Sequence, residues 1–386
     1  MIEEVSQNRN SWEPIVQDGL RFLMEQWQLG FVEAAHVMSF PREQGFIAAQ
    51  EQHYGDVFQR ALIADALCDA RELLGEQLQP VIEREVNYLL SCQRNSGVGG
   101  WSYFPNLPEL PPDADDLAQI MQVLLRSGRR TEVEKYCEVP LSVLLQDNTH
   151  LDGSFETWIV PATDRTPEQN LQFWWVQQAW GTGPDPDVMA NLLYALALYD
   201  PGRFDRVIQD GVAYLESQQR QDGSWQSSWY HGPYYGTYVC LRLLALVRPS
   251  SPAIARAINF LYECQQADGG WGIDDVSDPL STALALLSLG IVQQEVSEIA
   301  DIECVVQAHS YLEQCQETDK SWPSWKFIRM ELGRAAGRVR AILFYGSQTI
   351  TTAFVLKAAL AWHRFRRESE GALENPQLGL LDSRTN

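Results

Sequence analysis

The sequence predicts an all-α protein folded as an (α/α)6 barrel, in which an outer ring of helices surrounds an inner ring. Two observations support this prediction. Amphipathic helical segments recur and end on Gly- and Asp-rich turns that carry an aromatic residue, and a strongly apolar helical segment follows each turn. A helix that is apolar nearly all round must be buried on all sides. We therefore expect six hairpins, each made of one outer and one inner helix.

The expected outer helices are recognisable as copies of one another. The segment "IVQDGLRFLMEQ" reappears as "VIQDGVAYLESQ", and the helix-and-turn signature recurs as "LLSCQRNSGVGGW", "FLYECQQADGGW" and "YLEQCQETDKSW", with a weaker copy in "LLQDNTHLDGSF". In such a turn Gly supplies unusual backbone angles, Asp caps the next helix and the aromatic ring fills the gap between hairpins. The turn tryptophans are therefore predicted to be structural: Trp101, Trp225, Trp271 and Trp322.

The expected inner helices contain, in chain order, "DVFQRALIADAL", "DDLAQIMQVLL", "DVMANLLYALAL", "GTYVCLRLLALV", "LSTALALLSLG" and "ITTAFVLKAAL". Because they follow turns of the same kind, their N-termini should gather at one end of the barrel and form its mouth. No linker divides the chain, so we predict a single domain over residues 11–366 and a polar tail over 367–386.

The composition of the chain limits the binding partners and the cellular location that can be expected. A net charge of -22 and a pI near 4.6 argue against a nucleic-acid surface, which needs clustered basic residues. The chain has no apolar run of transmembrane length and no signal peptide in "MIEEVSQNRNSWEP", which predicts a cytoplasmic protein. An apolar barrel mouth would favour a homo-oligomer or peripheral contact with a membrane.

Three acids mark the start of the second inner helix in "PPDADDLAQ": Asp113, Asp115 and Asp116. They could simply cap the helix, because its N-terminus favours negative charge. Crowded carboxylates in a dry cavity could instead retain a proton and act as an acid. The next repeat, "PDPDVMANLL", keeps Asp185 and Asp187 but replaces the third acid by Val188, so this second pair is predicted to cap its helix.

The turns and the acid cluster resemble the QW repeats and the DxDD segment of the squalene-hopene cyclase and class II terpene cyclase superfamily. The stretch "DGSWQSSWYHGPYYGT" is also similar to that family, and the resemblance covers all six hairpins. It implies a terpene cyclase, an isomerase or lyase of terpenoid biosynthesis, in which the middle acid, Asp115, protonates an isoprenoid double bond. Asp113 and Asp116 would orient Asp115 or hold compensating charge. The side chain that fixes Asp115 could be His231, Asn191 or Tyr235.

The resemblance implies a linear prenyl diphosphate of roughly C15 to C20 as substrate, bound in a mostly apolar pocket. Aromatic residues near the mouth are candidates for stabilising a carbocation: Trp229, Tyr234, Tyr235 and Tyr345. The basic segment from Lys320 to Arg340 could grip the diphosphate, with Arg334 and Arg338 as the chosen residues, or could be a solvated helix face. No cofactor is required, although Mg²⁺ could accompany a diphosphate.

Alternatives remain open. The substrate could be a neutral isoprenoid, squalene-like or a prenylated aromatic, or the barrel could be a non-catalytic subunit of a larger complex. Protein prenyltransferases share the barrel, but they bind zinc through residue types that "GIDDVSDPLSTALAL" and "YGSQTITTAFVL" lack, so we predict no metal site. The second helical domain common in the family is replaced here by a loop over residues 28–55, which could close the cavity.

Overall fold

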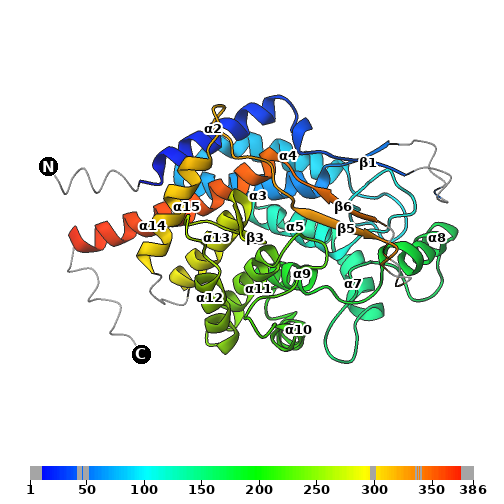
Figure 1. Ribbon diagram of the computed structural model, residues 1–386. Helices are drawn as coiled ribbons and strands as arrows, with labels where there is room; N and C mark the ends of the chain where they lie inside the picture. The colour runs from blue at the N-terminus through cyan, green and yellow to red at the C-terminus, as the bar shows by residue number, and fades with distance from the viewer. Residues whose placement is uncertain are drawn as a thin grey trace.

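The computed structural model describes residues 11–40, 46, 52–295, 301–334, 337, 339 and 341–374. Six inner helices form a closed ring in which each contacts the next and the last contacts the first (Figure 1). They are α3 (Val57–Leu74), α5 (Ala114–Arg126), α9 (Pro186–Tyr199), α11 (Tyr234–Val247), α13 (Pro279–Glu295) and α15 (Gln348–Glu374). The predicted α/α barrel is confirmed.

The outer helices are α2 (Glu13–Gln28), α4 (Gln79–Ser91), α7 (Glu138–Asp147), α10 (Asp205–Gln218), α12 (Pro252–Glu263) and α14 (Ile302–Cys315). Most of them pack against the inner helix that precedes them in the chain: α4 on α3, α10 on α9, α12 on α11 and α14 on α13. A short helix, α6 (Arg130–Tyr136), bridges α5 and α7. By the same rule α2 packs on α15, so the first and last described helices close the ring.

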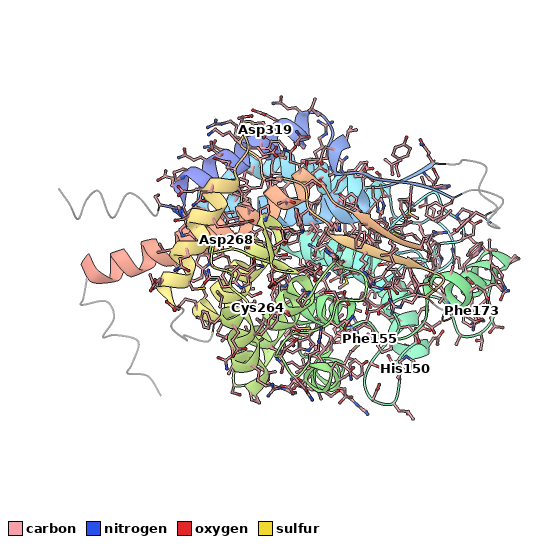
Figure 2. The ribbon with its side chains drawn as sticks, viewed as in Figure 1. His150, Phe155, Phe173, Cys264, Asp268 and Asp319 are labelled. Atoms are coloured by element: carbon pink, nitrogen blue, oxygen red, sulfur yellow. The ribbon has the colours of Figure 1, made fainter. Side chains whose placement is uncertain are left out.

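The turn tryptophans have the predicted structural role. Each is fully buried, and its indole Nε1 donates a hydrogen bond to a backbone carbonyl near the end of its own outer helix, as Trp225 does to Leu215 at 2.7 Å and Trp271 to Leu261 at 2.7 Å. The turn aspartates behave differently from the prediction. Asp268 and Asp319, labelled in Figure 2, accept hydrogen bonds from backbone N–H groups two residues further on, at 3.0 and 3.1 Å. They stabilise the turn itself rather than capping the next helix.

Several short elements gather at the mouth and were not predicted. They are three antiparallel hairpins, β1 (His36–Ser39) with β2 (Gln52–Gly55), β3 (Trp271–Ile273) with β4 (Val276–Asp278) and β5 (Ile328–Leu332) with β6 (Ala341–Tyr345), together with α8 (Pro167–Trp175) and a π-helical turn, η4 (Val176–Trp180). Strands of three to five residues are too short to show a clear period of two. In Figure 1, β1, β5, β6 and α8 lie at the same end of the barrel.

The last inner helix runs past the predicted end of the barrel domain. Helix α15 continues to Glu374, beyond residue 366 where the barrel was expected to end. Residues 375–386 of the expected tail lie outside the described chain.

Candidate active site

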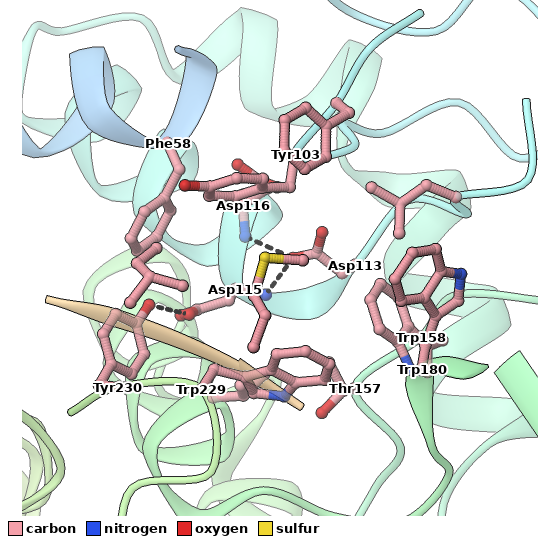
Figure 3. A pocket seen from close by; sticks show the side chains of 15 residues that line it. Phe58, Tyr103, Asp113, Asp115, Asp116, Thr157, Trp158, Trp180, Trp229 and Tyr230 are labelled. Carbon is pink, nitrogen blue, oxygen red and sulfur yellow. Dashed lines mark hydrogen bonds between the residues drawn. The ribbon is translucent and has the colours of Figure 1, made fainter. Parts of the chain in front are cut away.

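The three acids of the "DADD" segment lie at the N-terminus of α5, and each has a different environment. Asp113 is the N-cap residue: its Oδ1 accepts hydrogen bonds from the backbone N–H groups of Asp115 at 3.0 Å and Asp116 at 2.8 Å (Figure 3). Capping by Asp113 therefore leaves the other two carboxyl groups available for other roles.

Both carboxyl oxygens of Asp115 are hydrogen-bonded by uncharged side chains. Asn191 on α9 donates from Nδ2 to Oδ1 at 2.7 Å, and the hydroxyl of Tyr230 donates to Oδ2 in a short hydrogen bond. Of the three residues considered as partners for this acid, Asn191 is the one that bonds to it. The ring of His231 lies against Phe344 instead, with centroids 5.0 Å apart.

Burial controls the protonation of the cluster. It raises the pKa of Asp115 to about 6, even though the hydrogen bonds from Tyr230 and Asn191 act in the opposite direction. It raises the pKa of Asp113 to about 7, and burial together with the charge of Asp113 raises the pKa of Asp116 well above its usual range. Asp116 Oδ1 has no hydrogen-bond partner in the described structure, as suits a neutral carboxylic acid. The cluster thus retains protons close to neutral pH.

Asp115 faces a small, mostly apolar cavity of about 60 Å³. The wall includes seven aromatic rings among 15 lining residues: Phe58, Tyr103, Phe104, Trp158, Trp180, Trp229 and Tyr230. Figure 3 labels all of these rings except Phe104 and shows the labelled ones on several sides of the acids. Aromatic faces attract cations, so the rings of the wall would stabilise a positive charge formed beside Asp115.

The β5–β6 hairpin and the η4 segment cover this cavity. Ile328 and Met330 of β5 and Trp180 of η4 line it. The hairpin is held to the segment before α11 by backbone hydrogen bonds of 2.8 Å, from Arg329 N to the Trp229 carbonyl and from His231 N to the Phe327 carbonyl. The chain therefore supplies a cover of its own.

Part of the loop over residues 28–55 contributes to the same cover. Phe46 stacks on Trp175 with centroids 4.3 Å apart, and Phe40 lies 6.2 Å from Trp180. Residues 41–45 and 47–51 of this loop lie outside the described chain.

Asp185 does not cap α9, which corrects the prediction for the second acid pair. Its side chain makes no capping hydrogen bond. It accepts instead from Thr157 Oγ1 at 2.7 Å, Trp229 Nε1 at 2.6 Å and Arg334 at 2.8 Å. Asp187 is fully buried and accepts from the backbone N–H of Ser228 at 3.2 Å, a residue outside its own helix. Three strong donors from other segments compete successfully with the local backbone for Asp185.

The predicted substrate-binding aromatics are only partly brought together. Trp229 lines the cavity, whereas Tyr234, Tyr235 and Tyr345 do not. Tyr234 donates its hydroxyl to the Gly272 carbonyl at 3.1 Å, and Tyr345 donates to the Ala34 carbonyl at 2.5 Å. Tyr235 lies behind Tyr230, with ring centroids 3.9 Å apart.

The basic segment does not converge on one point in its described part. Lys320 pairs with Asp18 at 3.3 Å, Lys326 lies 4.7 Å from the centre of the Phe344 ring, and Arg329 pairs with Glu331. Arg334 is beside the cavity, because its guanidinium pairs with Asp185 and lies 5.4 Å from the centre of the Trp229 ring. Arg338 and Arg340 lie outside the described residues.

Sequence reasoning missed most of the cavity wall. Tyr103 and Phe104 lie ten and nine residues before Asp113 in "GGWSYFP", and Tyr230 directly follows Trp229, so these rings were close to residues already chosen. Trp158 and Trp180 come from the long connection between α7 and α9. Trp158 follows the weaker copy of the turn by three residues, whereas no copy of the repeat covers Trp180.

The described part of the chain holds neither a metal-binding cluster nor a membrane-spanning helix. No group of three or more His, Cys, Asp or Glu side chains there is arranged to hold a metal ion. None of the described helices is both long enough and apolar enough to cross a membrane.

A closed ring of paired helices with a buried, protonatable acid in an aromatic cavity defines a class of protein, the class II terpene cyclases. Sequence comparison agrees: the squalene-hopene cyclase C-terminal domain family matches residues 98–327. The chain belongs to this family.

Relatives and solved structures extend this assignment. The chain is 26% identical over 255 residues to a probable squalene-hopene cyclase of Sinorhizobium fredii, covering 59% of this chain and 37% of that protein. It is 35% identical over 230 residues to the terpentedienyl-diphosphate synthase of Kitasatospora griseola, covering 58% and 39%. The chain thus matches less than two fifths of the length of these curated relatives.

Among solved structures, a type II terpene cyclase from Scytonema in complex with geranylgeranyl dihydroxybenzoate superposes with a TM-score of 0.69 at 18% identity. The match covers 93% of this chain and 99% of that one. A single barrel of this size therefore also occurs in a solved cyclase.

Cyclisation is expected to be fastest below about pH 6 and to slow as the pH rises, because the acid must be protonated and burial raises the pKa of Asp115 from 3.8 to about 6. Between pH 3.8 and about 6 the native protein also holds a proton that the unfolded chain releases, so the free energy of unfolding should fall as the pH rises through that range and level off above it. A kcat profile against pH and denaturant titrations check both trends. A kcat that does not fall as the pH rises through about 6 would contradict the assignment of the acid.

Proposed function

We propose that this protein is a class II terpene cyclase in which Asp115 protonates the terminal double bond of a linear isoprenoid. The observation that carries the proposal is the placement of a protonatable carboxyl group, held only by neutral donors, in the wall of an aromatic cavity. In the reaction the O–H bond of Asp115 breaks, the π electrons of the alkene form a new C–H bond, and the substrate becomes a carbocation.

The surrounding groups have separate roles in this scheme. Asn191 and Tyr230 donate to the carboxylate that remains after proton transfer and so make Asp115 a stronger acid. Asp113 fixes the start of α5, and Asp116 stays neutral beside it. The aromatic rings stabilise the positive charge as it moves along the folded substrate.

The substrate proposed first is a prenyl diphosphate of roughly C15 to C20, with its head group at Arg334 on the rim and its apolar chain in the cavity. Arg338, which lies outside the described residues, belongs to this proposal as a second cation for the diphosphate. Mg²⁺ would enter only as a companion of the diphosphate, and no step depends on it.

A neutral head group is the second candidate. One observation favours it: Arg334 is already paired with Asp185 at 2.8 Å, so a diphosphate would have to compete with an existing ion pair. A squalene-like isoprenoid would not need this cation, whereas the geranylgeranyl dihydroxybenzoate bound in the Scytonema structure has a carboxylate of its own.

Peripheral membrane contact of a cytoplasmic protein is part of the same proposal. Val37 and Tyr54 pair across β1 and β2 near the mouth and are 48% and 57% exposed, with Val32 73% exposed just before them. Vesicle flotation of the wild type and of Val32→Ser measures this contact. Membrane contact through these side chains would be contradicted if both proteins float equally with the vesicles, or if neither does.

The direct test is to incubate the purified protein with linear C15, C20 and C30 isoprenoids and with a prenylated aromatic, and to identify products by mass spectrometry. The expected product is a cyclic isomer of the same mass, formed without release of diphosphate. A folded protein that converts none of these substrates would favour the non-catalytic barrel subunit.

Replacing Arg334 by Gln is expected to raise the KM for a prenyl diphosphate by tenfold to about a hundredfold, because one charge-assisted contact, worth roughly 1.5 to 3 kcal/mol, is lost. A neutral isoprenoid should keep its KM. The matched control is Arg329→Gln, which removes a cation paired with Glu331 on the same hairpin. The double variant Arg334→Gln with Asp185→Asn shows whether an unpaired Asp185 causes the change. An unaltered KM for the prenyl diphosphate would mean that Arg334 does not bind the diphosphate and would favour a neutral substrate.

A further inference from the structure

The hydrogen bonding of Asp115 continues beyond Asn191 into the barrel. The carbonyl oxygen of the Asn191 side chain, Oδ1, accepts two hydrogen bonds: one from Gln122 Nε2 at 2.8 Å and one from the Arg242 guanidinium at 2.8 Å. Gln122 lies on α5, two turns after Asp115, and Arg242 lies on α11. Three adjacent inner helices therefore meet at one amide group.

This arrangement leaves Asn191 a single orientation. Because its Oδ1 is occupied by two donors, its Nδ2 must point the other way, toward Asp115 Oδ1 at 2.7 Å. An amide N–H can only donate, so Asp115 Oδ1 must accept and cannot carry a proton directed at Asn191. The transferable proton of the neutral acid then belongs on Oδ2, the oxygen that Tyr230 also contacts.

We infer that Gln122 and Arg242 are positioning residues, which fix the Asn191 amide and thereby place the transferable proton of Asp115 on Oδ2. This inference rests on the proposed function of Asp115 as the acid. Neither residue lines the cavity that Asp115 faces. Both line a separate, larger polar cavity formed by later turns of the inner helices, so they act on Asp115 only through Asn191 and through charge.

The unusual environment of Arg242 supports a role beyond packing. None of the described carboxylates lies within ion-pair distance of its guanidinium, and its Nε has no hydrogen-bond partner. The guanidinium carbon lies 4.1 Å from the centre of the Tyr194 ring and 5.3 Å from that of Tyr238. A largely buried cation without an ion pair is costly to stability.

Arg126, one turn further along α5 from Gln122, shows the contrast. It pairs with Asp65 at 2.5 Å, Asp69 at 2.6 Å and Glu72 at 2.7 Å, which is the environment of a structural cation. Arg242 instead donates its hydrogen bond to Oδ1 of Asn191, the residue that holds Asp115.

Charged and titratable groups surround Asp115 from every neighbouring element, and Arg242 is the cation among them. The others are Asp113 and Asp116 on its own helix, Asp185 and Asp187 on α9, and the hydroxyl groups of Tyr230 and Tyr235 at the start of α11. The charge of Arg242 favours the carboxylate form of Asp115 and therefore opposes the acids around it.

The test uses infrared difference titration of the full chain, with the protonated carboxyl band of Asp115 assigned by its loss in Asp115→Asn. The variants are Arg242→Met, which removes the charge and the donor, and Gln122→Met, which removes a donor without changing charge. Arg242→Lys restores the charge, and Arg206→Met is a control at an exposed arginine. The same proteins are assayed for kcat and KM.

We expect the Asp115 midpoint to move to higher pH in both Met variants, further in Arg242→Met, and to return toward the wild-type value in Arg242→Lys. Turnover should fall by roughly tenfold or more with KM unchanged, because the lost hydrogen bonds support the acid and not the substrate. If Gln122→Met and Arg242→Met titrate and turn over as wild type, the inference is wrong. Gln122→Met keeps the test valid if Arg242→Met does not fold.

The infrared readout also separates this inference from the proposed function. A shifted Asp115 midpoint in a protein that cyclises no isoprenoid would leave the positioning network standing and remove the cyclase. If the wild type cyclises an isoprenoid but the Asp115 midpoint does not shift in the variants, the proposed cyclase stands and the positioning role of Gln122 and Arg242 is wrong.

Discussion

Asp115→Asn is expected to lower the rate of cyclisation by at least about 10²- to 10⁴-fold, the range typical of general acid–base groups, while the protein stays folded. Asparagine has nearly the same size as aspartate, and its carbonyl oxygen can still accept from Asn191, whose Nδ2 is 2.7 Å from Asp115 Oδ1. What it lacks is a transferable proton. The measurement is single-turnover product formation, with circular dichroism to verify the fold.

The matched control for this variant is Asp185→Asn. Asp185 occupies the corresponding position of the next repeat. It accepts hydrogen bonds from three donors and so helps to hold together the segments around the cavity. It should therefore affect substrate binding more than proton transfer. Wild-type turnover in Asp115→Asn would show that the proton comes from another group, with Asp116 the next residue to examine.

The second large effect is on stability. Lys357→Met is expected to lower the free energy of unfolding by about 3 to 5 kcal/mol, because removing one member of a buried charge network leaves uncompensated charge behind. Lys357 Nζ donates to Asp65 at 2.6 Å and to Asp69 at 2.5 Å, and these two acids also pair with Arg126. After the substitution the buried carboxylate of Asp65 and the partly exposed carboxylate of Asp69 would share one guanidinium.

Urea denaturation of Lys357→Met measures this loss, and adding Asp65→Asn should recover part of it by removing one of the unpaired charges. Lys320→Met is the control: its partner Asp18 lies 3.3 Å away, but Lys320 is 44% exposed, so the change should be at most about 1 kcal/mol. A loss below about 1 kcal/mol in Lys357→Met would mean that Arg126 alone balances both acids.

The sequence predicted the barrel well because its signals are local. Each helix can be recognised from the apolar pattern of about a dozen consecutive residues, and the repeated turn fixes the order of outer and inner helices. The position of the acid was predictable for the same reason, since the DxDD segment directly follows a turn. The partners of Asp115 were harder, because they lie 76 and 115 residues away in the chain. Asn191 was one of three candidates and Tyr230 was not considered.

The wall of the cavity could not be read from local pattern. Tyr234 and Tyr235 open α11 and would point to the mouth if helix position alone decided, but the first bonds to Gly272 and the second packs behind Tyr230. Asp185 looked like a cap because its segment copies the first acid cluster. Its actual partners, Thr157, Trp229 and Arg334, come from three other segments that the repeat does not specify.

The packing of α2 on α15 has a consequence for the order in which the chain folds. Ser11 and Asp18, beside and within α2, bond to His309 and Gln316, each 298 residues further along the chain. Contacts of such long sequence separation form late, because the entropy of closing the chain must be overcome first. During synthesis, α2 leaves the ribosome long before α15 has been made. Until then the apolar side of α2 is not covered by the helix against which it finally packs. A nascent chain whose α2 is not yet packed exposes apolar surface and is therefore prone to aggregate until α15 has been made.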